Sequence, residues 1–323
     1  MNDLRASVLI PTYNRRSFLM QTLNSLQAQS VESGAFEVIV AIDGSTDDTV
    51  EALEHFRPTY PLRWITQRNA GSAAASNSAA REAHHEVLIF LDDDQIASPD
   101  LVAVHLEVQE QQGPALVQGF YPLAKGYDRR GASLIYQHWL ERSVAPLDRQ
   151  HRMSAEIWSA NISLTRDLWA RVRGFDEGFR QYGNEDTDFG IRIAAIGVPV
   201  VFEPRALSYH LHHVSYGAAR RQAFSGGKSI VHLARKHSLP IETFIGSPID
   251  QGVTRRLASA WRAAPTAMDA LGRTLIASLW AADLLRVRQL QLLMARVLHR
   301  YYKVGGVVLE TAQSGTRVEH GAA

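Results

Sequence analysis

The chain has 323 residues, of which 46% are hydrophobic and 21% charged, the composition of a globular protein with a sizeable core. It contains no cysteine, which excludes disulfides and thiolate chemistry, so a bound metal ion needs Asp, Glu or His ligands. The net charge of +1 conceals a division, because residues 214–323 hold 15 Lys and Arg against 6 Asp and Glu, whereas the preceding residues hold 19 against 27.

The first hundred residues alternate short apolar runs with segments of helical spacing. Apolar runs predict strands at residues 6–10, 36–42, 62–66 and 86–91. Helical spacing is found between them, at residues 16–29, 47–56 and 72–82. Strands and helices in this order predict an α/β fold with a parallel sheet and right-handed crossovers.

The rest of the chain is less regular in its middle and helical towards its end. Residues 116–120 and 198–202 resemble strands, and residues 187–196 resemble a helix. From residue 214 onward helical patterns dominate, which predicts a helical, basic C-terminal region.

Polar clusters follow three of the predicted strands. They are Pro11-Thr12-Tyr13-Asn14, Asp43-Gly44-Ser45 and Asp92-Asp93-Asp94. Ligands of parallel sheets bind beyond the carboxyl ends of the strands, so we expect these clusters to converge on one site.

The three adjacent carboxylates of Asp92, Asp93 and Asp94 repel one another unless a divalent cation offsets their charge. In an extended segment Asp92 and Asp94 would share one side of the chain and could share a cation. The alternative is an exposed acidic turn before a helix that starts near Ser98.

Two further clusters suit metal or proton chemistry. His210, His212 and His213 follow the strand-like segment 198–202, and imidazole is a good ligand for divalent metals, although most histidines are structural. Glu185 and Asp186 precede an apolar helix, where a carboxylate suits a general base but also suits helix capping.

Nucleotide recognition has weaker signals. The Asp43 carboxylate can accept hydrogen bonds from a base or ribose, and Tyr13 can stack on a base ring. The small residues from Asn69 to Gly71 open a helix whose N-terminus suits a phosphate. The phosphate loops of dinucleotide dehydrogenases and of common ATPases are absent from the sequence.

Taken together, these motifs resemble the family 2 glycosyltransferases of bacteria. The resemblance is an ordered series of short segments over about residues 6–213, in which no segment is specific by itself. The segments are VLIPTYNR at 8–15, AIDGSTDDT at 41–49, QRNAG at 67–71, LIFLDDD at 88–94, ANISL at 160–164, GFDEGF at 174–179, GNEDTD at 183–188 and YHLHH at 209–213.

The resemblance implies an inverting enzyme of the GT-A fold, which uses a nucleoside-diphosphate sugar and Mn²⁺ or Mg²⁺. Asp92–Asp94 corresponds to the DxD element, in which the middle acid meets ribose or phosphate and the last acid meets the metal. His212, or else His210, would be a further ligand, and Asp186, beside Glu185, would be the base that deprotonates the acceptor hydroxyl.

The same resemblance implies the residues around the donor. Pro11, Thr12, Tyr13 and Asp43 would surround the base and ribose, with Arg68, Asn69 and Gly71 near the phosphates. The sugar and acceptor side would be formed by Asn161, Gly174, Phe175, Asp176 and Glu177.

One position departs from the family pattern, which often has Ala-Arg-Asn in the helix after Asn-x-Gly. This chain has Ala75-Ser76-Asn77, so a basic contact to the diphosphate is missing there. Arg68 or a basic residue of the C-terminal region could replace it.

The resemblance divides the chain into a GT-A domain at 1–213 and a helical basic region at 214–323. Within the first, the nucleotide-sugar half would span about 1–115 and the acceptor half about 116–213. A UDP-sugar is the favoured donor; the acceptor stays open among glycan, lipid-linked and small-molecule hydroxyls, and no nucleic-acid partner is indicated.

Neither a signal-peptide core nor a membrane span is found, so we expect a cytoplasmic protein. The basic C-terminal helices, with Trp261 and Trp280, suggest contact with the inner face of the membrane, with self-association as the competing explanation. Two other functions remain as alternatives: a catalytically inactive nucleotide-binding relative and a sugar nucleotidyltransferase.

Overall fold

The computed structural model describes residues 4–127, 129–144, 157–180, 182–245 and 251–314. The chain divides into two compact units. The first comprises Met1–Lys125, Trp139–Arg180 and Glu185–His212, and the second comprises Gly126–His138, Gln181–Asn184 and His213–Ala323.

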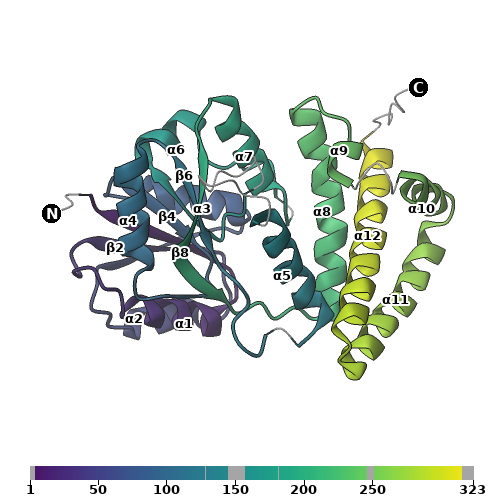
Figure 1. The fold of residues 1–323 in the computed structure, drawn as a ribbon, viewed down its shortest axis with the longest axis horizontal. Helices are drawn as coiled ribbons and strands as arrows, with labels where there is room; N and C mark the ends of the chain where they lie inside the picture. The colour runs from purple at the N-terminus through teal and green to yellow at the C-terminus, as the bar shows by residue number, and fades with distance from the viewer. Residues whose placement is uncertain (1–3, 128, 145–156, 181, 246–250, 315–323) are drawn as a thin grey trace. The chain divides into compact units, whose positions relative to one another are not determined.

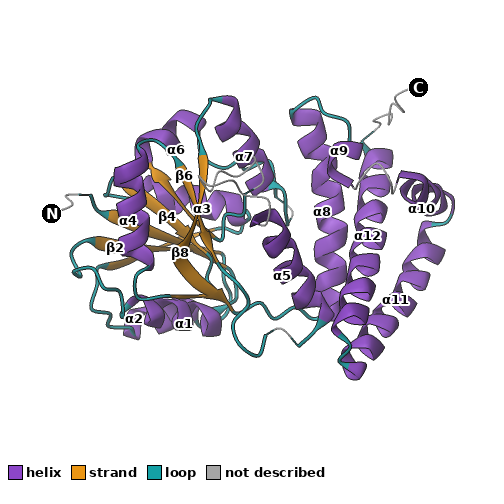
Figure 2. Ribbon diagram, viewed as in Figure 1, coloured by secondary structure: helices purple, strands orange, loops and turns teal. Residues whose placement is uncertain are grey.

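The first unit contains an eight-stranded sheet flanked by helices (Figures 1 and 2). The strand order is β3-β2-β1-β4-β7-β6-β8-β5. The strands are β1 (Ala6–Thr12), β2 (Phe36–Asp43), β3 (Leu62–Gln67), β4 (Val87–Leu91), β5 (Gln95–Ala97), β6 (Leu116–Phe120), β7 (Asn161–Thr165) and β8 (Val200–His210). The helices between them are α1 (Arg16–Leu26), α2 (Thr49–His55), α3 (Ser72–Arg81), α4 (Leu101–Gln112), α6 (Arg166–Val172) and α7 (Glu185–Ala195).

Strands β3, β2, β1 and β4 are parallel, as the alternation of strands and helices predicts. Their side chains alternate between two buried faces. In β1, Leu9 packs with α3 on one face, whereas Val8 and Ile10 pack with Leu19 and Leu23 of α1 on the other. A strand covered on both faces is a nearly continuous apolar run, which is why the sequence reveals these four strands so clearly.

The remaining half of the sheet is mixed. Strand β7, which the sequence pattern does not reveal, pairs antiparallel with both β4 and β6. Strand β8 is longer than the predicted segment 198–202 and ends at His210, and β5 pairs antiparallel with its last part. The predicted start of a helix near Ser98 was therefore early, since β5 intervenes and α4 begins at Leu101.

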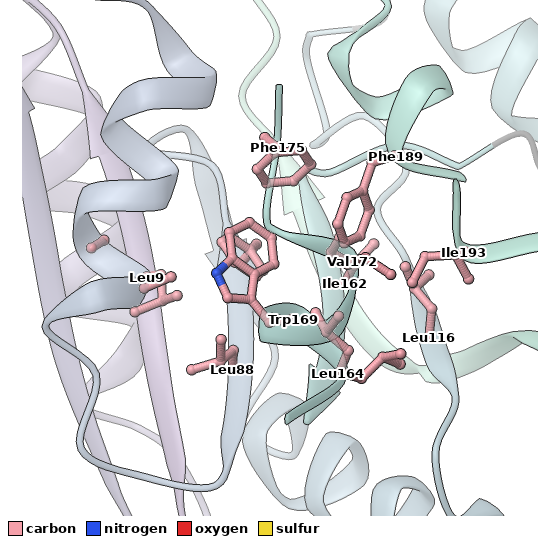
Figure 3. Packing of buried hydrophobic residues seen from close by; sticks show 14 of the residues in the cluster. Leu9, Leu88, Leu116, Ile162, Leu164, Trp169, Val172, Phe175, Phe189 and Ile193 are labelled. Atoms are coloured by element: carbon pink, nitrogen blue, oxygen red, sulfur yellow. The ribbon is translucent and has the colours of Figure 1, made fainter. Parts of the chain in front are cut away.

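An aromatic cluster fills one face of the sheet. Phe90 of β4, Trp169 of α6, Phe175 and Phe189 of α7 are in contact, with ring centroids 4.7 to 5.4 Å apart. Figure 3 shows these rings of α6 and α7 among the aliphatic side chains of the sheet. This cluster fixes the start of α7 and the loop before it relative to β4, and both carry candidate site residues.

The second unit is helical. It contains the first part of α5 (Gly131–Val144), followed by α8 (Tyr216–Lys236), α9 (Glu242–Ile245), α10 (Gln251–Ala263), α11 (Pro265–Leu285) and α12 (Arg288–Gln313). Helices α8 and α12 lie side by side (Figure 1). A Cβ on Gly306 would lie 2.0 Å from the Phe224 carbonyl oxygen, so glycine permits this close approach.

The core of this unit contains the rings of Trp261, Tyr301 and Tyr302. None of the described helices has the length and apolarity to cross a membrane. Together with the mostly parallel sheet of the first unit, these helices confirm the predicted fold class.

Candidate active site

The loops that follow β1 and β2 are joined by Asn14, which has a left-handed backbone with φ of 52°. Its amide donates to Ser45 Oγ at 2.9 Å, and its side-chain oxygen accepts from the Thr46 amide at 2.7 Å. Tyr13, beside it, is 48% exposed. The two predicted polar clusters therefore meet, and an aromatic ring is presented to solvent between them, as base stacking requires.

Asp43 is buried at the end of β2 and holds the segment before α3. Its carboxylate accepts from Gln67 Nε2 at 2.8 Å, from the Ala70 amide at 2.9 Å and from the Gly71 amide at 2.8 Å. Asn69 also donates to the Asp43 carbonyl oxygen at 3.0 Å. Asp43 thus lies at the carboxyl edge of the sheet, as expected. Most of the hydrogen bonds that its carboxylate accepts hold the loop 69–71. Arg68, beside that loop, is exposed.

The middle acid of the triplet faces β1 and α1. Asp93 accepts from Thr12 Oγ1 at 2.7 Å and pairs with Arg15 Nη1 at 3.2 Å. Thr22 Oγ1 donates to the Asp93 carbonyl oxygen at 2.8 Å. Thr12, which we predicted beside the base and ribose, is therefore buried, and its hydroxyl is hydrogen-bonded to Asp93. Pro11 is half-buried.

Arg15 also pairs with Asp94, so one guanidinium serves two acids of the triplet. Burial opposes the charge of Asp94, but His210 and Arg15 outweigh it and hold the pKa of Asp94 below its usual range. Burial instead raises the pKa of Asp93, although Arg15 works against that shift. The triplet is thus three acids with different environments rather than one exposed acidic turn.

Asp94, His210 and His212 form a group able to hold a metal ion. Each offers one ligand atom, and these atoms lie within 4.8 Å of one another. His210 Nε2 lies 3.1 Å from Asp94 Oδ2. The pairing of Gln95 with His210, and the hydrogen bond from the Leu211 amide to the Asp94 carbonyl oxygen, bring the two segments together.

The donor set of this group fits a divalent cation. Asp94 Oδ1 is buried and has no hydrogen-bond partner within the described part of the chain. A buried carboxylate oxygen without a donor is costly, and a metal ion would satisfy it. One carboxylate with two imidazoles is a suitable set for Mn²⁺ and other first-row metals.

Asp92, which we had expected among the ligands, lies outside this group. The chain turns at Asp93 and Asp94 instead of staying extended, and Asp92 is not among the three clustered ligand atoms, although the charges of Asp94 and His210 act on it. His213 is exposed and does not belong to the group either.

Asp92 lies within electrostatic range of both the ligand group and the start of α7, since Asp94 and Asp186 oppose its charge while His210 and Arg15 favour it. Burial raises the pKa of Asp92, the charge of Asp94 adds to the effect, and the charge of Asp186 contributes as well. Asp186 and Asp92 are therefore close enough to interact, although 94 positions separate them in the sequence.

Asp186 lies in the first turn of α7 together with Glu185. Its Oδ1 accepts from the Thr187 amide at 2.7 Å, a local bond of the capping kind. Burial raises the pKa of Asp186 to about 6, although that bond favours the charged form. A carboxylate with such a pKa is well suited to accept a proton near neutral pH.

The loop 174–177 is held by α3. Gly174 has a left-handed φ of 63°, and a Cβ there would lie 2.6 Å from Asn77 Oδ1. The Phe175 side chain is buried in the aromatic cluster and does not face a ligand. Asp176 is half-buried, and its carboxylate accepts from the Gly178 amide at 2.8 Å. Asn77 anchors this loop through hydrogen bonds to the backbone of Phe175.

Asn161 pairs with Leu91 at the edge where the acidic triplet begins, but its side chain is buried. It is fully buried in β7, where its Oδ1 accepts from His105 Nε2 at 2.9 Å and its Nδ2 donates to the Ala206 carbonyl oxygen at 2.9 Å. Burial lowers the pKa of His105 to about 4, so the imidazole is neutral in this network. Asn161 therefore joins the strands of the mixed half of the sheet, and its expected place on the sugar side is not what the geometry gives.

Sequence reasoning missed Arg15 and the structural role of Asn77. The sequence offered one signal for Arg15. It is the first basic residue after the polar cluster 11–14, and this cluster was expected to meet the acidic cluster 92–94. In the sequence, Asn77 was noted only because it follows Ser76, the position at which the family pattern has an arginine.

Comparison with solved structures places this fold among the GT-A glycosyltransferases. The mannosyltransferase PcManGT of Pyrobaculum calidifontis, solved with GDP-Man and Mn²⁺, superimposes with a TM-score of 0.62 at 20% identity and covers 92% of this chain and 87% of its own. S. aureus TarS 1–349, solved with UDP-GlcNAc, has a TM-score of 0.52 at 19% identity and covers 97% and 93%.

Residues 7–156 match the family model for glycosyl transferase family 2, and residues 142–214 match the model described as the N-terminal domain of galactosyltransferase. Over residues 7–156 the chain therefore matches the family 2 glycosyltransferases. It is 34% identical over 223 residues to validoxylamine A glucosyltransferase of Streptomyces hygroscopicus subsp. jinggangensis, which covers 60% of this chain. The matching segment spans 52% of that relative's length.

Proposed function

We propose that this chain is an inverting glycosyltransferase that moves a sugar from a nucleoside-diphosphate sugar to an acceptor hydroxyl. The observation that carries the proposal is the meeting of two groups at one edge of the sheet. One is the ligand group of Asp94, His210 and His212, and the other is the raised-pKa carboxylate of Asp186, which interacts with Asp92 of the same triplet.

Asp186 is the base in this proposal. Its carboxylate accepts the proton of the acceptor hydroxyl while the acceptor oxygen bonds to the anomeric carbon and the bond from that carbon to the diphosphate breaks. Attack from the face opposite the leaving group inverts the anomeric configuration. Glu185, in the same helical turn, lies next to this base and would orient the acceptor.

Asp94, His210 and His212 would hold the Mn²⁺ or Mg²⁺ ion, which supplies positive charge to the leaving diphosphate. Asp92 and Asp93 would lie towards ribose and phosphate. Arg15 is the basic residue nearest to them, and it offers a diphosphate contact that the helix residue Ser76 lacks.

Tyr13 would stack on the base, and the loop 69–71, held by Asp43, would border the ribose and phosphates. Asp176 and the backbone of Gly174 would border the sugar. A UDP-sugar is the favoured donor. Because the structural neighbours bind GDP-Man and UDP-GlcNAc, UDP and GDP are the first nucleotides to test for binding. We take residues 1–213 as the transferase domain and 214–323 as an accessory region.

The test compares Asp186→Asn with Asp167→Asn. Asp167 is an exposed acid in the first turn of α6, so it matches the helical position of Asp186 without its burial. We expect Asp186→Asn to lower turnover by about 10³-fold or more while diphosphate binding, followed by thermal shift with Mn²⁺, stays as in the unmodified protein. Asp167→Asn should keep full turnover.

Unchanged turnover in Asp186→Asn would remove Asp186 from the role of base. A folded protein that shifts with none of UDP, GDP, dTDP, CMP or ADP, with or without Mn²⁺, would contradict the transferase itself. Release of pyrophosphate from a nucleoside triphosphate and a sugar phosphate would identify a nucleotidyltransferase instead.

A further inference from the structure

Helix α11 and the start of α12 expose several large apolar side chains. Helix α11 packs its inner face, with Gly272, Leu279 and Ala282, inside the helical unit. Six other apolar side chains of α11 and the start of α12 are half exposed or more: Leu271, Trp280, Leu284, Leu285, Val287 and Leu293, at 50 to 66%. Exposed apolar side chains that gather at one end of a helix pair are typical of an interaction site, so this end of α11 indicates a partner.

The charges around this face have one sign. Between residues 265 and 297 every exposed charged side chain is an arginine, namely Arg273, Arg286, Arg288 and Arg296. Leu284, Leu285 and Val287 therefore alternate with Arg286 and Arg288 where α11 meets α12. We use the name α11–α12 corner for the surface formed by Trp280, Leu284, Leu285, Val287, Arg286 and Arg288.

The two acids of α11 are both paired, and Asp269, whose side chain is 34% exposed, also lies 3.7 Å from Arg273. Asp269 pairs with Arg220 at 2.7 Å, and Asp283 accepts from the Gly131 amide at 2.8 Å and from Tyr216 at 2.8 Å. Both are half-buried. The corner thus presents apolar surface beside Arg286 and Arg288, whereas the charge of Arg273 is partly offset by Asp269.

We propose that the α11–α12 corner docks on the surface of a membrane that contains anionic lipids. The leucines and Trp280 would enter the boundary between headgroups and acyl chains, and the arginines would pair with lipid phosphates. Exposed Trp suits this boundary because its ring is apolar and its N–H is polar. Since no described helix can span a membrane, contact is with the surface only.

A second copy of the chain fits this corner less well. A symmetric pair uses the same surface on both partners, so the pairing of two corners brings Arg286 and Arg288 close to arginines of equal charge. Like charges across an interface disfavour association. Anionic lipid supplies the opposite charge that a second copy lacks.

The test is co-sedimentation of the full chain, without donor or metal, with vesicles of phosphatidylcholine alone or mixed with phosphatidylglycerol. We expect binding only to the mixed vesicles and weaker binding at high salt. Leu284→Ser with Leu285→Ser should weaken binding about tenfold or more, because apolar insertion is lost. Arg286→Gln with Arg288→Gln should weaken it by about 30-fold, because each charge contributes about 1 kcal/mol.

The matched control removes two exposed arginines from the first unit, Arg5→Gln with Arg171→Gln, and should bind vesicles as the unmodified protein does. Circular dichroism establishes that each variant is folded. Absence of vesicle binding at low salt, or equal loss in the control, would overturn the proposal. So would a dimer in sedimentation equilibrium that dissociates in the leucine variant while vesicles stay unbound. Because no donor is present, failure here leaves the proposed transfer reaction untouched.

Discussion

Asn77 and Phe175 form two hydrogen bonds that close the loop 174–177 onto α3. Asn77 Nδ2 donates to the Phe175 carbonyl oxygen at 2.9 Å, and the Phe175 amide donates to Asn77 Oδ1 at 2.9 Å. Asn77 Nδ2 also reaches Glu177 Oε1 at 2.9 Å. One side chain thus fixes a loop almost a hundred residues away, beside the aromatic cluster of Phe175 and Phe189.

Asn77→Ala should destabilise the protein by about 2 to 3 kcal/mol, because the amide and carbonyl groups of Phe175 would stay buried without partners. The measurement is chemical denaturation, with Ser78→Ala in the same helix as the control, for which we expect less than about 0.5 kcal/mol. Equal stability of the two variants would mean that the paired bonds with Phe175 contribute nothing.

Turnover should depend on the protonation of Asp186. Because the base must be ionised and the pKa of Asp186 is raised to about 6, kcat/KM should rise about tenfold per pH unit below pH 6 and level off above it. The residual activity of Asp186→Asn should lack this limb. An acidic limb near pH 4 instead would assign the base to a carboxylate of ordinary pKa.

Asp186→Asn should also stabilise the protein at pH 7.5. Burial raises the pKa of Asp186 above its unfolded value of 3.8, so its contribution to stability is fully present below about pH 4 and is lost as the pH rises through about 6. Replacing the ionised group with a neutral amide should therefore gain on the order of 1 to 3 kcal/mol at pH 7.5 and almost nothing at pH 4. Denaturation at both pH values measures this, and a gain of equal size at both would rule out ionisation as its cause.

His212→Ala should weaken Mn²⁺ binding by about 10- to 100-fold, since one of three protein ligands is lost. Isothermal titration of Mn²⁺ into the protein with a saturating nucleoside diphosphate is the measurement. His213→Ala removes the exposed neighbour outside the ligand group and should bind as the unmodified protein does. If both variants bind Mn²⁺ alike, the ligand group does not include His212.

Local pattern was sufficient for much of the fold. Strands β1 to β4 and the helices between them were predicted from sequence because each buried strand is an unbroken apolar run and each helix carries one apolar face. Strand β7 escaped prediction because it lies outside that alternation and is defined by its pairing with β4 and β6. The fold class and the family followed from the ordered motifs, and both were confirmed.

The sequence by itself determined which acids and histidines exist near strand ends. Only the tertiary structure decided how they are grouped. The antiparallel pairing of β5 with β8 brings Asp94 to His210 and His212, and Asp92 lies within electrostatic range of both Asp94 and Asp186. Arg15 and Asn77 acquired their partners in the same way, because contacts between residues that are distant in the sequence depend on strand order and register, which local periodicity does not encode.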